Sequence, residues 1–430
     1  MMITKNIENL DFNDVDSLIW NAVFSTNDEV RKKAKEMIFL KGLEHGIFPS
    51  SIQSFYEAMG RGEVNNITVP AINLRGLTYY AARAIFRSAI KNNVGLIIFE
   101  IARSEIGYTH QRPSEYTANI IAAALREGFY APVFLQGDHF QINRKNFEKN
   151  QEDEINNVKN LIKESIEAGF FNIDIDASTM VDYSRKSLKD QQKENFSLTA
   201  MFTDYIRDLQ PDGITVSVGG EIGHIGGKNS TVEEFESFME GYLERLNCKK
   251  GISKISVQTG TAHGGIPLKN GTLAKVKLDF DVLKSIGSLA QKKYSLSGAV
   301  QHGASTLPLE LFDKFPECYT SEIHLATGFQ NLMYDLAPDW LKNEIYQYLQ
   351  EKCKEEWKED MTYEQFIYKT RKKGFGPFKQ QWWSLPEDIK NAIMDELSKT
   401  FDMIFEKLKV KNSLPIINKY INPVKINLNF

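Results

Sequence analysis

Cysteine is scarce in this chain, and so are long apolar runs and any excess of charge of one sign. The 430 residues include three cysteines, Cys248, Cys318 and Cys353, with no C-x-x-C spacing. This excludes a disulfide framework and a thiolate zinc site, and it fits a reducing compartment. Any bound metal must therefore be held by histidines and carboxylates.

No uninterrupted apolar run approaches the roughly 18 residues that a membrane-spanning helix needs. The first residues carry Glu8 and Asp11 where a signal peptide would be apolar, so we expect a cytoplasmic protein. The 52 basic and 56 acidic side chains leave a net charge of −4, with no long block of one sign. This charge balance gives no sign of a surface that binds nucleic acid or an anionic membrane, and it favours an enzyme that acts on a small molecule.

Short apolar runs alternate with amphipathic stretches from about residue 64 to residue 330. The predicted strands are Ile67–Asn73, Gly95–Ala102, Ala131–Asp138, Phe171–Ser178, Ile214–Glu221, Lys254–Gly260, Tyr294–His302 and Ser321–Ala326. Parallel strands need crossover helices, and eight of them close with a filled core. The pattern predicts an α/β protein with a (β/α)8 TIM barrel over residues 64–330.

Helical extensions are predicted on both sides of the barrel. Residues 1–63 contain the amphipathic run Asp28–Leu43 and a turn at Phe48–Ser51, and we expect them to cap the barrel. Residues 331–430 form a C-terminal helical extension. Its predicted helices are Asp339–Glu359 and Pro386–Leu408.

A basic and aromatic segment, Lys369–Trp383, separates these two C-terminal helices. The favoured interpretation is a loop whose aromatic rings pack on the barrel while its lysines stay in water. The alternative is that Arg371, Lys372 or Lys379 reaches over an active site and binds a phosphate.

Three of the seven histidines, His139, His263 and His302, fall at the ends of the third, sixth and seventh predicted strands. The carboxyl ends of the strands carry the active site in (β/α)8 barrels. A single histidine there is more often a packed residue than a ligand, but three on one rim, each beside a small residue, favour a shared metal ion. Three neutral imidazoles leave an open coordination position, which is typical of a catalytic Zn²⁺.

Carboxylates occupy the same rim. Asp174 and Asp176 share one face of their strand because side chains alternate. We expect Asp174 to belong to a buried network that orients the histidines, and Asp176, nearer the rim, to be functional together with Glu221. Asp138 is adjacent to His139 and so cannot easily share its direction, but it can present a proton to a substrate oxygen at the metal.

Glycines follow the later strands, at Gly264 and Gly303, with hydroxyl groups nearby on Ser305 and Thr327. Such segments suit a cradle of backbone N–H groups for a phosphate, which barrels commonly form near their seventh and eighth strands.

These segments resemble class II, metal-dependent ketose-bisphosphate aldolases, the group that contains fructose- and tagatose-bisphosphate aldolases. The likeness follows the family's order in Val69–Asn73, Gly137–His139, Ile173–Ser178, Gly220–Gly227, Gly260–Gly264, Val300–Ser305 and Glu322–Thr327. Each segment alone is weak evidence, whereas seven in order are specific.

The resemblance implies that His139, His263 and His302 bind Zn²⁺ and that Asp138 moves the proton at the hydroxyl where the carbon–carbon bond breaks. Asp176 and Glu221 would ligate an alternative metal position, with room for a second divalent or a monovalent cation. The residues implied in binding the substrate and its phosphate are Asn73, Gly264, Gly303, Ser305 and Thr327.

The implied reaction is the reversible cleavage of a phosphorylated ketose, a 1-phosphate or 1,6-bisphosphate, to dihydroxyacetone phosphate and an aldehyde. A zinc-stabilised enediolate is the implied intermediate, because a Lewis acid spreads the charge that develops on its oxygens. The resemblance also implies a homo-oligomer, a dimer or tetramer.

The sequence departs from the family at three points. The loop after the fifth strand lacks the family's aligned acid, for which Glu233 or Glu234 could substitute. His324 stands where the family has asparagine, which would alter contacts to the ketose phosphate. Both extensions exceed a typical member. The alternative is therefore a non-catalytic, aldolase-like partner subunit. The presence of the three histidines and Asp138 argues against this alternative. A metal hydrolase is disfavoured because the first strand lacks a His-x-His pair, and a sugar isomerase or epimerase stays open.

Overall fold

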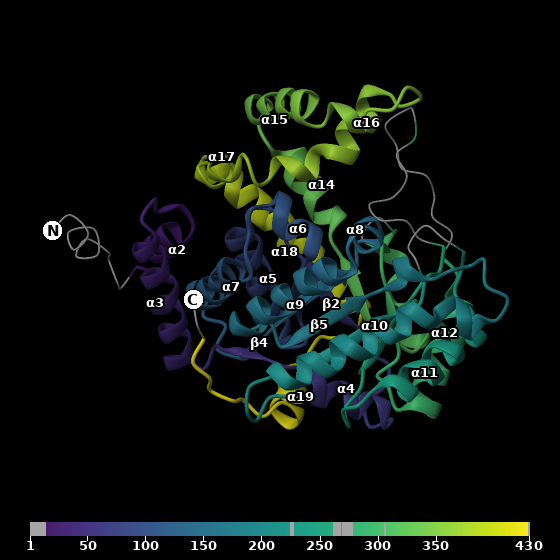
Figure 1. The fold of residues 1–430 in the computed structure, drawn as a ribbon. Coiled ribbons are helices and arrows are strands. Elements are labelled where there is room, and N and C mark those ends of the chain that lie inside the picture. Colours follow the sequence, from purple (N-terminus) through teal and green to yellow (C-terminus); the bar gives the residue numbers. More distant parts are fainter. Residues whose placement is uncertain (1–13, 224–227, 261–267, 269–277, 305–306, 429–430) are drawn as a thin grey trace.

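Eight parallel strands close into a barrel in the computed structural model, which describes residues 14–223, 228–260, 268, 278–304 and 307–428 (Figure 1). The barrel strands are β2 (Val69–Asn73), β3 (Ile98–Ala102), β4 (Val133–Gln141), β5 (Asn172–Asp176), β6 (Ser217–Glu221), β7 (Lys254–Val257), β8 (Ala299–Gln301) and β9 (Thr320–Leu325). Each pairs with its neighbours in chain order, and β2 pairs with β9 to close the ring. All eight predicted strands and the TIM-barrel fold are confirmed.

Helices cover the outside of this barrel between the strands. They are α5 (Thr78–Asn92), α6 (Arg103–Tyr108), α7 (Pro113–Glu127), α8 (Arg144–Lys149), α9 (Gln151–Glu167), α10 (Leu188–Leu209), α11 (Val232–Arg245), α12 (Phe280–Tyr294), α13 (Lys314–Glu317) and α14 (Thr327–Leu336). In α9 the side chain of Asn150 caps the first turn, and Val158, Ile162 and Ile166 are buried at a four-residue spacing. One apolar stripe thus fixes which face of the helix meets the sheet.

The N-terminal segment reaches both the side and the amino-terminal end of the barrel. Helices α2 (Val15–Phe24) and α3 (Asp28–Glu44) pack against α7. The predicted turn at Phe48–Ser51 is wrong in part, because Pro49–Ser50 forms a short strand, β1, that pairs with the start of β4. Helix α4 (Gln53–Gly60) follows, and its Tyr56 hydroxyl donates to Glu322 inside the barrel.

The C-terminal extension forms α15 (Asp339–Lys352), α16 (Tyr363–Thr370), α17 (Lys379–Trp383), α18 (Glu387–Lys407) and α19 (Leu414–Tyr420). Helix α18 agrees with its prediction and packs along α5. Helix α15 ends earlier than predicted because the chain turns back at Trp357, whose ring stacks on Phe366 with centroids 4.7 Å apart. In Figure 1, α15, α16 and α17 gather above α14, at the opposite end from α4 and α19.

The basic and aromatic segment is not the loop that the sequence predicted. It comprises the end of α16, a 3-10 turn at Arg371–Gly374, and α17. Its aromatic rings do pack inward, since Phe375 and Trp382 are buried. Among the helices of the described residues, none combines the length and apolar character needed to cross a membrane.

Candidate active site

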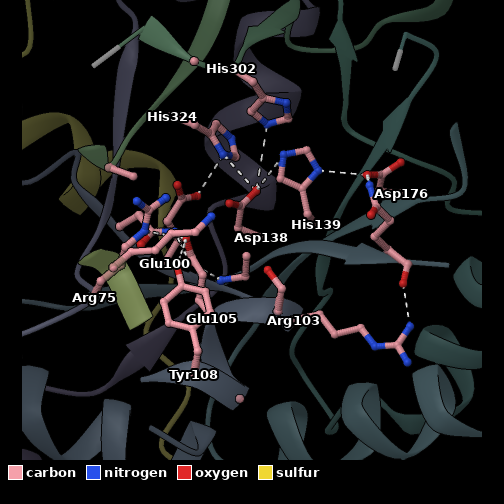
Figure 2. Close-up of a pocket in the computed structure, with 18 of the residues that line it drawn as sticks. Arg75, Glu100, Arg103, Glu105, Tyr108, Asp138, His139, Asp176, His302 and His324 are labelled. Atoms are coloured by element: carbon pink, nitrogen blue, oxygen red, sulfur yellow. Dashed lines mark hydrogen bonds and ion pairs between the residues drawn. The ribbon is translucent and has the colours of Figure 1, made fainter. Parts of the chain in front are cut away.

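A cavity of about 670 Å³ opens where the carboxyl ends of the strands converge. Residues from β2, β3, β4, β5, β6 and β9 line it, together with the segments that follow β8 and β9. Lys372 from the C-terminal extension also reaches it. Figure 2 shows three histidines around Asp138 in this cavity, with Arg75, Glu105 and Tyr108 on another wall. Carboxylates, imidazoles and basic side chains thus share one polar pocket.

A bulge in β4 brings two adjacent residues into that pocket. The pairing of β4 with β5 shifts register between Gly137 and Phe140, and His139 adopts a left-handed backbone with φ of 41°. Such a bulge re-aims side chains that would otherwise alternate across the sheet. Asp138 and His139 therefore both line the cavity, which corrects the expectation that they could not easily share a direction.

His139 lies between carboxylates on both sides of its ring. Its Nδ1 is 3.0 Å from Oδ2 of Asp176 and 3.2 Å from Oε2 of Glu221, while its Nε2 is 3.7 Å from Oδ1 of Asp138. Asp176 is itself held by Ser178 and Gln141. This arrangement fixes the orientation of the His139 ring.

His302 lies beside His139 and repeats the pattern. The two ring centroids are 4.2 Å apart. Nδ1 of His302 is 3.9 Å from Oε2 of Glu221, and its Nε2 is 3.9 Å from Oδ1 of Asp138. Each of the two imidazoles therefore presents one nitrogen to Glu221 and the other to Asp138, which is a donor set suited to a divalent cation.

Every predicted site residue that the structure describes lines this cavity: Asn73, Asp138, His139, Asp176, Glu221, His302, Gly303 and Thr327. Gly303 has a φ of 72°, a backbone conformation that favours glycine. Three further predicted residues, His263, Gly264 and Ser305, lie outside the described residues.

The comparison with protein families decides the identity of this arrangement. The family model for class-II fructose-bisphosphate aldolases matches residues 53–373, which is most of the chain. The chain belongs to the class II fructose-bisphosphate aldolase family. The match covers the barrel, α4 and the C-terminal extension as far as the turn that carries Lys372. No curated relative matches the chain by sequence.

Solved structures share the fold of this aldolase-family chain. A fructose-bisphosphate aldolase from Campylobacter jejuni has 18% identity and a TM-score of 0.50, covering 85% of this chain and 97% of its own. The YdjI aldolase of Escherichia coli has 12% identity and a TM-score of 0.50, covering 84% and 98%. A protein described as a probable tagatose 6-phosphate kinase from Sinorhizobium meliloti has 13% identity and a TM-score of 0.52, covering 82% and 93%. At these identities the likeness shows the fold alone.

Burial and charge shift the proton equilibria of this aldolase-family site. Burial, reinforced by Asp176, raises the pKa of Glu221 to about 7. Burial lowers the pKa of His139, but the carboxylates of Asp138 and Glu221 outweigh it and hold that pKa well above its ordinary value. A metal ion that enters the site must therefore displace protons.

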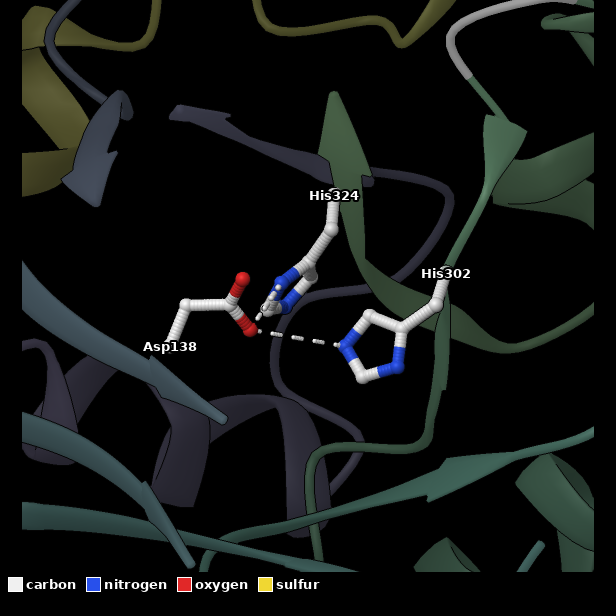
Figure 3. A group of neighbouring side chains, drawn as sticks. All are labelled: Asp138, His302 and His324. Carbon is white, nitrogen blue, oxygen red and sulfur yellow. Dashed lines mark hydrogen bonds and ion pairs between the residues drawn. The ribbon is translucent and has the colours of Figure 1, made fainter. Parts of the chain in front are cut away.

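His324, the strand residue that departs from the family, lines the cavity. The sequence predicted only that it would alter contacts to the ketose phosphate. Nδ1 of His324 is 3.1 Å from Oδ1 of Asp138, which also faces His302 (Figure 3). The same Nδ1 is 3.0 Å from Oε2 of Glu100, and Nε2 is 2.6 Å from Oε1 of Glu322. The alternation Glu322-x-His324 on one strand was the available signal, because such residues share a face.

The network below His324 involves Asp174, as the sequence predicted for an orienting residue. Lys254, fully buried, lies 2.9 Å from Oδ1 of Asp174 and 2.5 Å from Oε1 of Glu322. Nε2 of His324 is 3.6 Å from Oδ2 of Asp174. Asp174 thus contacts Lys254 and His324 inside the barrel, whereas Asp176 lines the cavity.

Basic side chains form another wall of the cavity. Arg75 donates to Glu105 at 2.7 Å and to the Thr327 hydroxyl at 3.3 Å. Lys372 lies with its Nζ 5.6 Å from the centre of the Tyr108 ring. Burial and the nearby Arg75 lower the pKa of Lys372.

Of the three basic residues considered in the C-terminal segment, only Lys372 lines the cavity. Arg371 donates to Asn331 and lies against Tyr334, and Lys379 pairs with Glu115 at 2.6 Å. The favoured expectation that every lysine of this segment stays in water is therefore wrong for Lys372.

Neither glutamate suggested as a substitute base lines the cavity. Glu234 closes the N-terminal capping box of α11 with Thr231 and pairs with Lys228 at 2.6 Å. Glu233 precedes it in the first turn of the same helix. The structure therefore uses Glu234 as a helix cap.

Proposed function

We propose that this chain is a metal-dependent aldolase that reversibly cleaves a phosphorylated ketose to dihydroxyacetone phosphate and an aldehyde. The observation that carries the proposal is the convergence of Asp138, His139 and His302 at the carboxyl end of the barrel, within a family of class II aldolases. Donor atoms of His139, His302 and Glu221 lie within 4.8 Å of one another, and nitrogen and carboxylate donors at that spacing fit Zn²⁺.

His139 and His302 would hold the metal ion, with Glu221 as a neighbouring carboxylate donor. When bound, the ion supplies Lewis-acid stabilisation of the charge that develops on the ketose oxygens. Asp176 faces the same nitrogen, Nδ1 of His139, at 3.0 Å and adds a second carboxylate beside Glu221. These contacts pre-organise the site before the substrate arrives.

Asp138 is the residue that moves the proton at the hydroxyl where the carbon–carbon bond breaks. Its Oδ1 faces the nitrogens of His139 and His302 while the side chain lines the cavity, so a hydroxyl bound beside the metal would lie within its reach. A positioned acid or base of this kind contributes roughly 10² to 10⁴-fold to the rate.

Arg75 and Lys372 support the choice of a phosphorylated substrate. Both are cations in a pocket that otherwise contains several buried carboxylates, and phosphate oxygens accept strong hydrogen bonds from such groups. Gly303 and Thr327 lie on the same cavity and fit a role in phosphate binding. A ketose 1-phosphate or 1,6-bisphosphate has the charge to engage this wall.

We further propose that the enzyme works in the cytoplasm, within carbohydrate metabolism, as a homo-oligomer.

The direct test of the aldolase activity is a cleavage assay with zinc-loaded protein and a panel of ketose phosphates that includes fructose and tagatose 1,6-bisphosphates and ketose 1-phosphates. Triose phosphate released is followed by coupled NADH oxidation. Release that a chelator stops and Zn²⁺ restores supports the proposal.

The control is the Asp138→Asn variant, which keeps the size of the side chain. It should hold zinc and lose turnover. If no ketose phosphate is cleaved by the wild-type protein, and cleavage appears only when a second aldolase is added, the non-catalytic partner subunit becomes the better account.

A further inference from the structure

His324 supplies the imidazole nitrogen that lies nearest to Asp138, the residue assigned to proton transfer. Nδ1 of His324 is 3.1 Å from Oδ1 of Asp138, which is within hydrogen-bond distance. The Nε2 atoms of His139 and His302 face the same oxygen at 3.7 and 3.9 Å. Figure 3 shows this oxygen near the rings of His302 and His324. Of the three rings, that of His324 is therefore the one placed to direct the Asp138 carboxylate.

The second nitrogen of His324 anchors the ring. Nε2 lies 2.6 Å from Oε1 of Glu322, which shares a face of β9 with His324 because the two residues are two positions apart. Each ring nitrogen thus faces a carboxylate oxygen that can accept a hydrogen bond. With both ends bonded and the side chain 6% exposed, the ring has little freedom to turn.

Glu322 is itself held from three other elements. Its Oε1 accepts hydrogen bonds from Gln136 on β4 at 2.8 Å and from Lys254 on β7 at 2.5 Å. Its Oε2 accepts a hydrogen bond from the Tyr56 hydroxyl on α4. These four side chains are fully buried, and a buried polar network with its partners in place is rigid. The anchor of His324 therefore does not depend on the loops around the cavity.

Glu100 faces the same nitrogen of His324 but has another donor. Its Oε2 is 3.0 Å from Nδ1 of His324 and accepts a hydrogen bond from the Gln136 amide, also at 3.0 Å. The ring thus lies where two carboxylates meet. Of these two, Asp138 is the one that the proposed reaction uses.

We propose that His324 is a positioning residue for Asp138, whose carboxylate it holds in place through the hydrogen bond from Nδ1. The inference rests on the proposed function, in which Asp138 moves the proton, and it adds the side chain that sets the direction of Asp138. A displacement of about 1 Å in a reacting group can cost about 10²-fold in rate. Loss of this bond should therefore lower kcat about 100-fold and change KM and zinc binding little.

Two amide substitutions separate the two ends of the His324 ring. The amide nitrogen of asparagine is bonded to Cγ, as Nδ1 of histidine is, whereas that of glutamine lies one bond further out, as Nε2 does. His324→Asn therefore keeps a donor for Asp138 and loses the contact with Glu322, and His324→Gln does the reverse. We expect kcat within tenfold of the wild type for His324→Asn and about 100-fold lower for His324→Gln.

The variants are compared by kcat, KM and zinc content measured on the same samples. KM and zinc content should stay within threefold of the wild type in both. The control His45→Asn removes an exposed imidazole at the end of α3 and should change none of these quantities. A larger loss of kcat in His324→Asn than in His324→Gln would overturn the inference, because the contact with Glu322 would then be the one that matters.

A double-mutant cycle separates positioning of Asp138 from a general structural role. If His324 acts through Asp138, His324→Gln should lower kcat less than threefold further in a protein that already carries Asp138→Asn. A further loss of about 100-fold in that background would refute the inference, because the two residues would then contribute independently.

Crystal structures of the wild type and of His324→Gln test the inference without a substrate. The wild type should show the hydrogen bond from Nδ1 to Asp138, and in the variant the Asp138 carboxylate should turn to another rotamer. An Asp138 side chain that keeps its rotamer in the variant would contradict the inference. If His324→Gln does not fold, the wild-type crystal decides by the presence or absence of that bond. Failure of wild-type cleavage would instead count against the aldolase proposal, so the two failures are distinguishable.

Discussion

The paired rings of His139 and His302 divide the cavity into two sides that differ in their use of carboxylates. On the Glu221 side, Asp176 accepts hydrogen bonds from Gln141 and from the backbone and hydroxyl of Ser178 as well as facing His139. On the Asp138 side, the carboxylate faces three imidazole nitrogens and the cavity. The first side has the contacts to hold the rings in place, and the second has the access to act on a substrate.

The largest expected effect comes from neutralising the Asp138 side. Asp138→Asn should lower kcat by roughly 10² to 10⁴-fold, the range for a lost general acid or base, while zinc stays bound. Steady-state kinetics and zinc content measured on the same sample check this. Turnover within tenfold of the wild type would show that the two sides do not differ as described.

The pH dependence of metal binding tests how many protons the metal-free site holds. The pKa of Glu221 is raised to about 7, and that of His139 is held well above its ordinary value, so the metal-free site carries protons near neutral pH. Zinc must displace them, so apparent affinity should rise from pH 6 to pH 8, by roughly tenfold per pH unit for each proton released.

Glu221→Gln sharpens this measurement, because it removes one titrating group from the Glu221 side. The slope of log affinity against pH should fall by about one below pH 7. An affinity independent of pH in the wild type would contradict the raised pKa values.

A smaller effect on zinc binding is expected from a substitution on the Glu221 side. Asp176→Asn removes a carboxylate that faces Nδ1 of His139 beside Glu221, and it should weaken zinc binding by roughly 10- to 100-fold. Asp182→Asn, in the segment after β5 and paired with Arg185, is the matched control. Equal affinity for both variants would show that Asp176 has no part in the metal site.

The smallest effect is expected at the basic wall. Lys372→Met should raise KM for a phosphorylated ketose about tenfold with little change in kcat, because it removes one charge-assisted contact to the phosphate. Lys379→Met is the control, since Lys379 pairs with Glu115 away from the cavity. The same KM for both variants would remove Lys372 from the substrate site.

Much of the fold followed from the sequence because its signals were local. Each of the eight strands and the amphipathic helices between them can be recognised from a pattern of about ten residues. The carboxyl ends of parallel strands must then meet at one face of the barrel. Asp138, His139 and His302 were therefore predictable as neighbours. The C-terminal turn at Arg371–Gly374 was not, because its placement depends on tertiary packing of Phe375 and Trp382.

Two features of the site required the structure. A strand pattern predicts alternation, and only the bulge in β4 shows that Asp138 and His139 face the same cavity. The sequence predicted that His324 would alter contacts to the ketose phosphate, but not which residues it contacts, since its partners Asp138 and Glu100 come from β4 and β3, far away in the chain. The expected domain boundaries and oligomeric state stay predictions, and light scattering would test the latter.

The most direct test of the aldolase account is NMR of dihydroxyacetone phosphate in D₂O with the zinc-loaded protein, with and without a chelator. The account predicts stereospecific loss of one carbon-bound proton, stopped by the chelator and restored by Zn²⁺. This result needs no knowledge of the aldehyde. Absence of exchange from protein that demonstrably holds zinc would contradict the account and favour a partner subunit without its own catalysis.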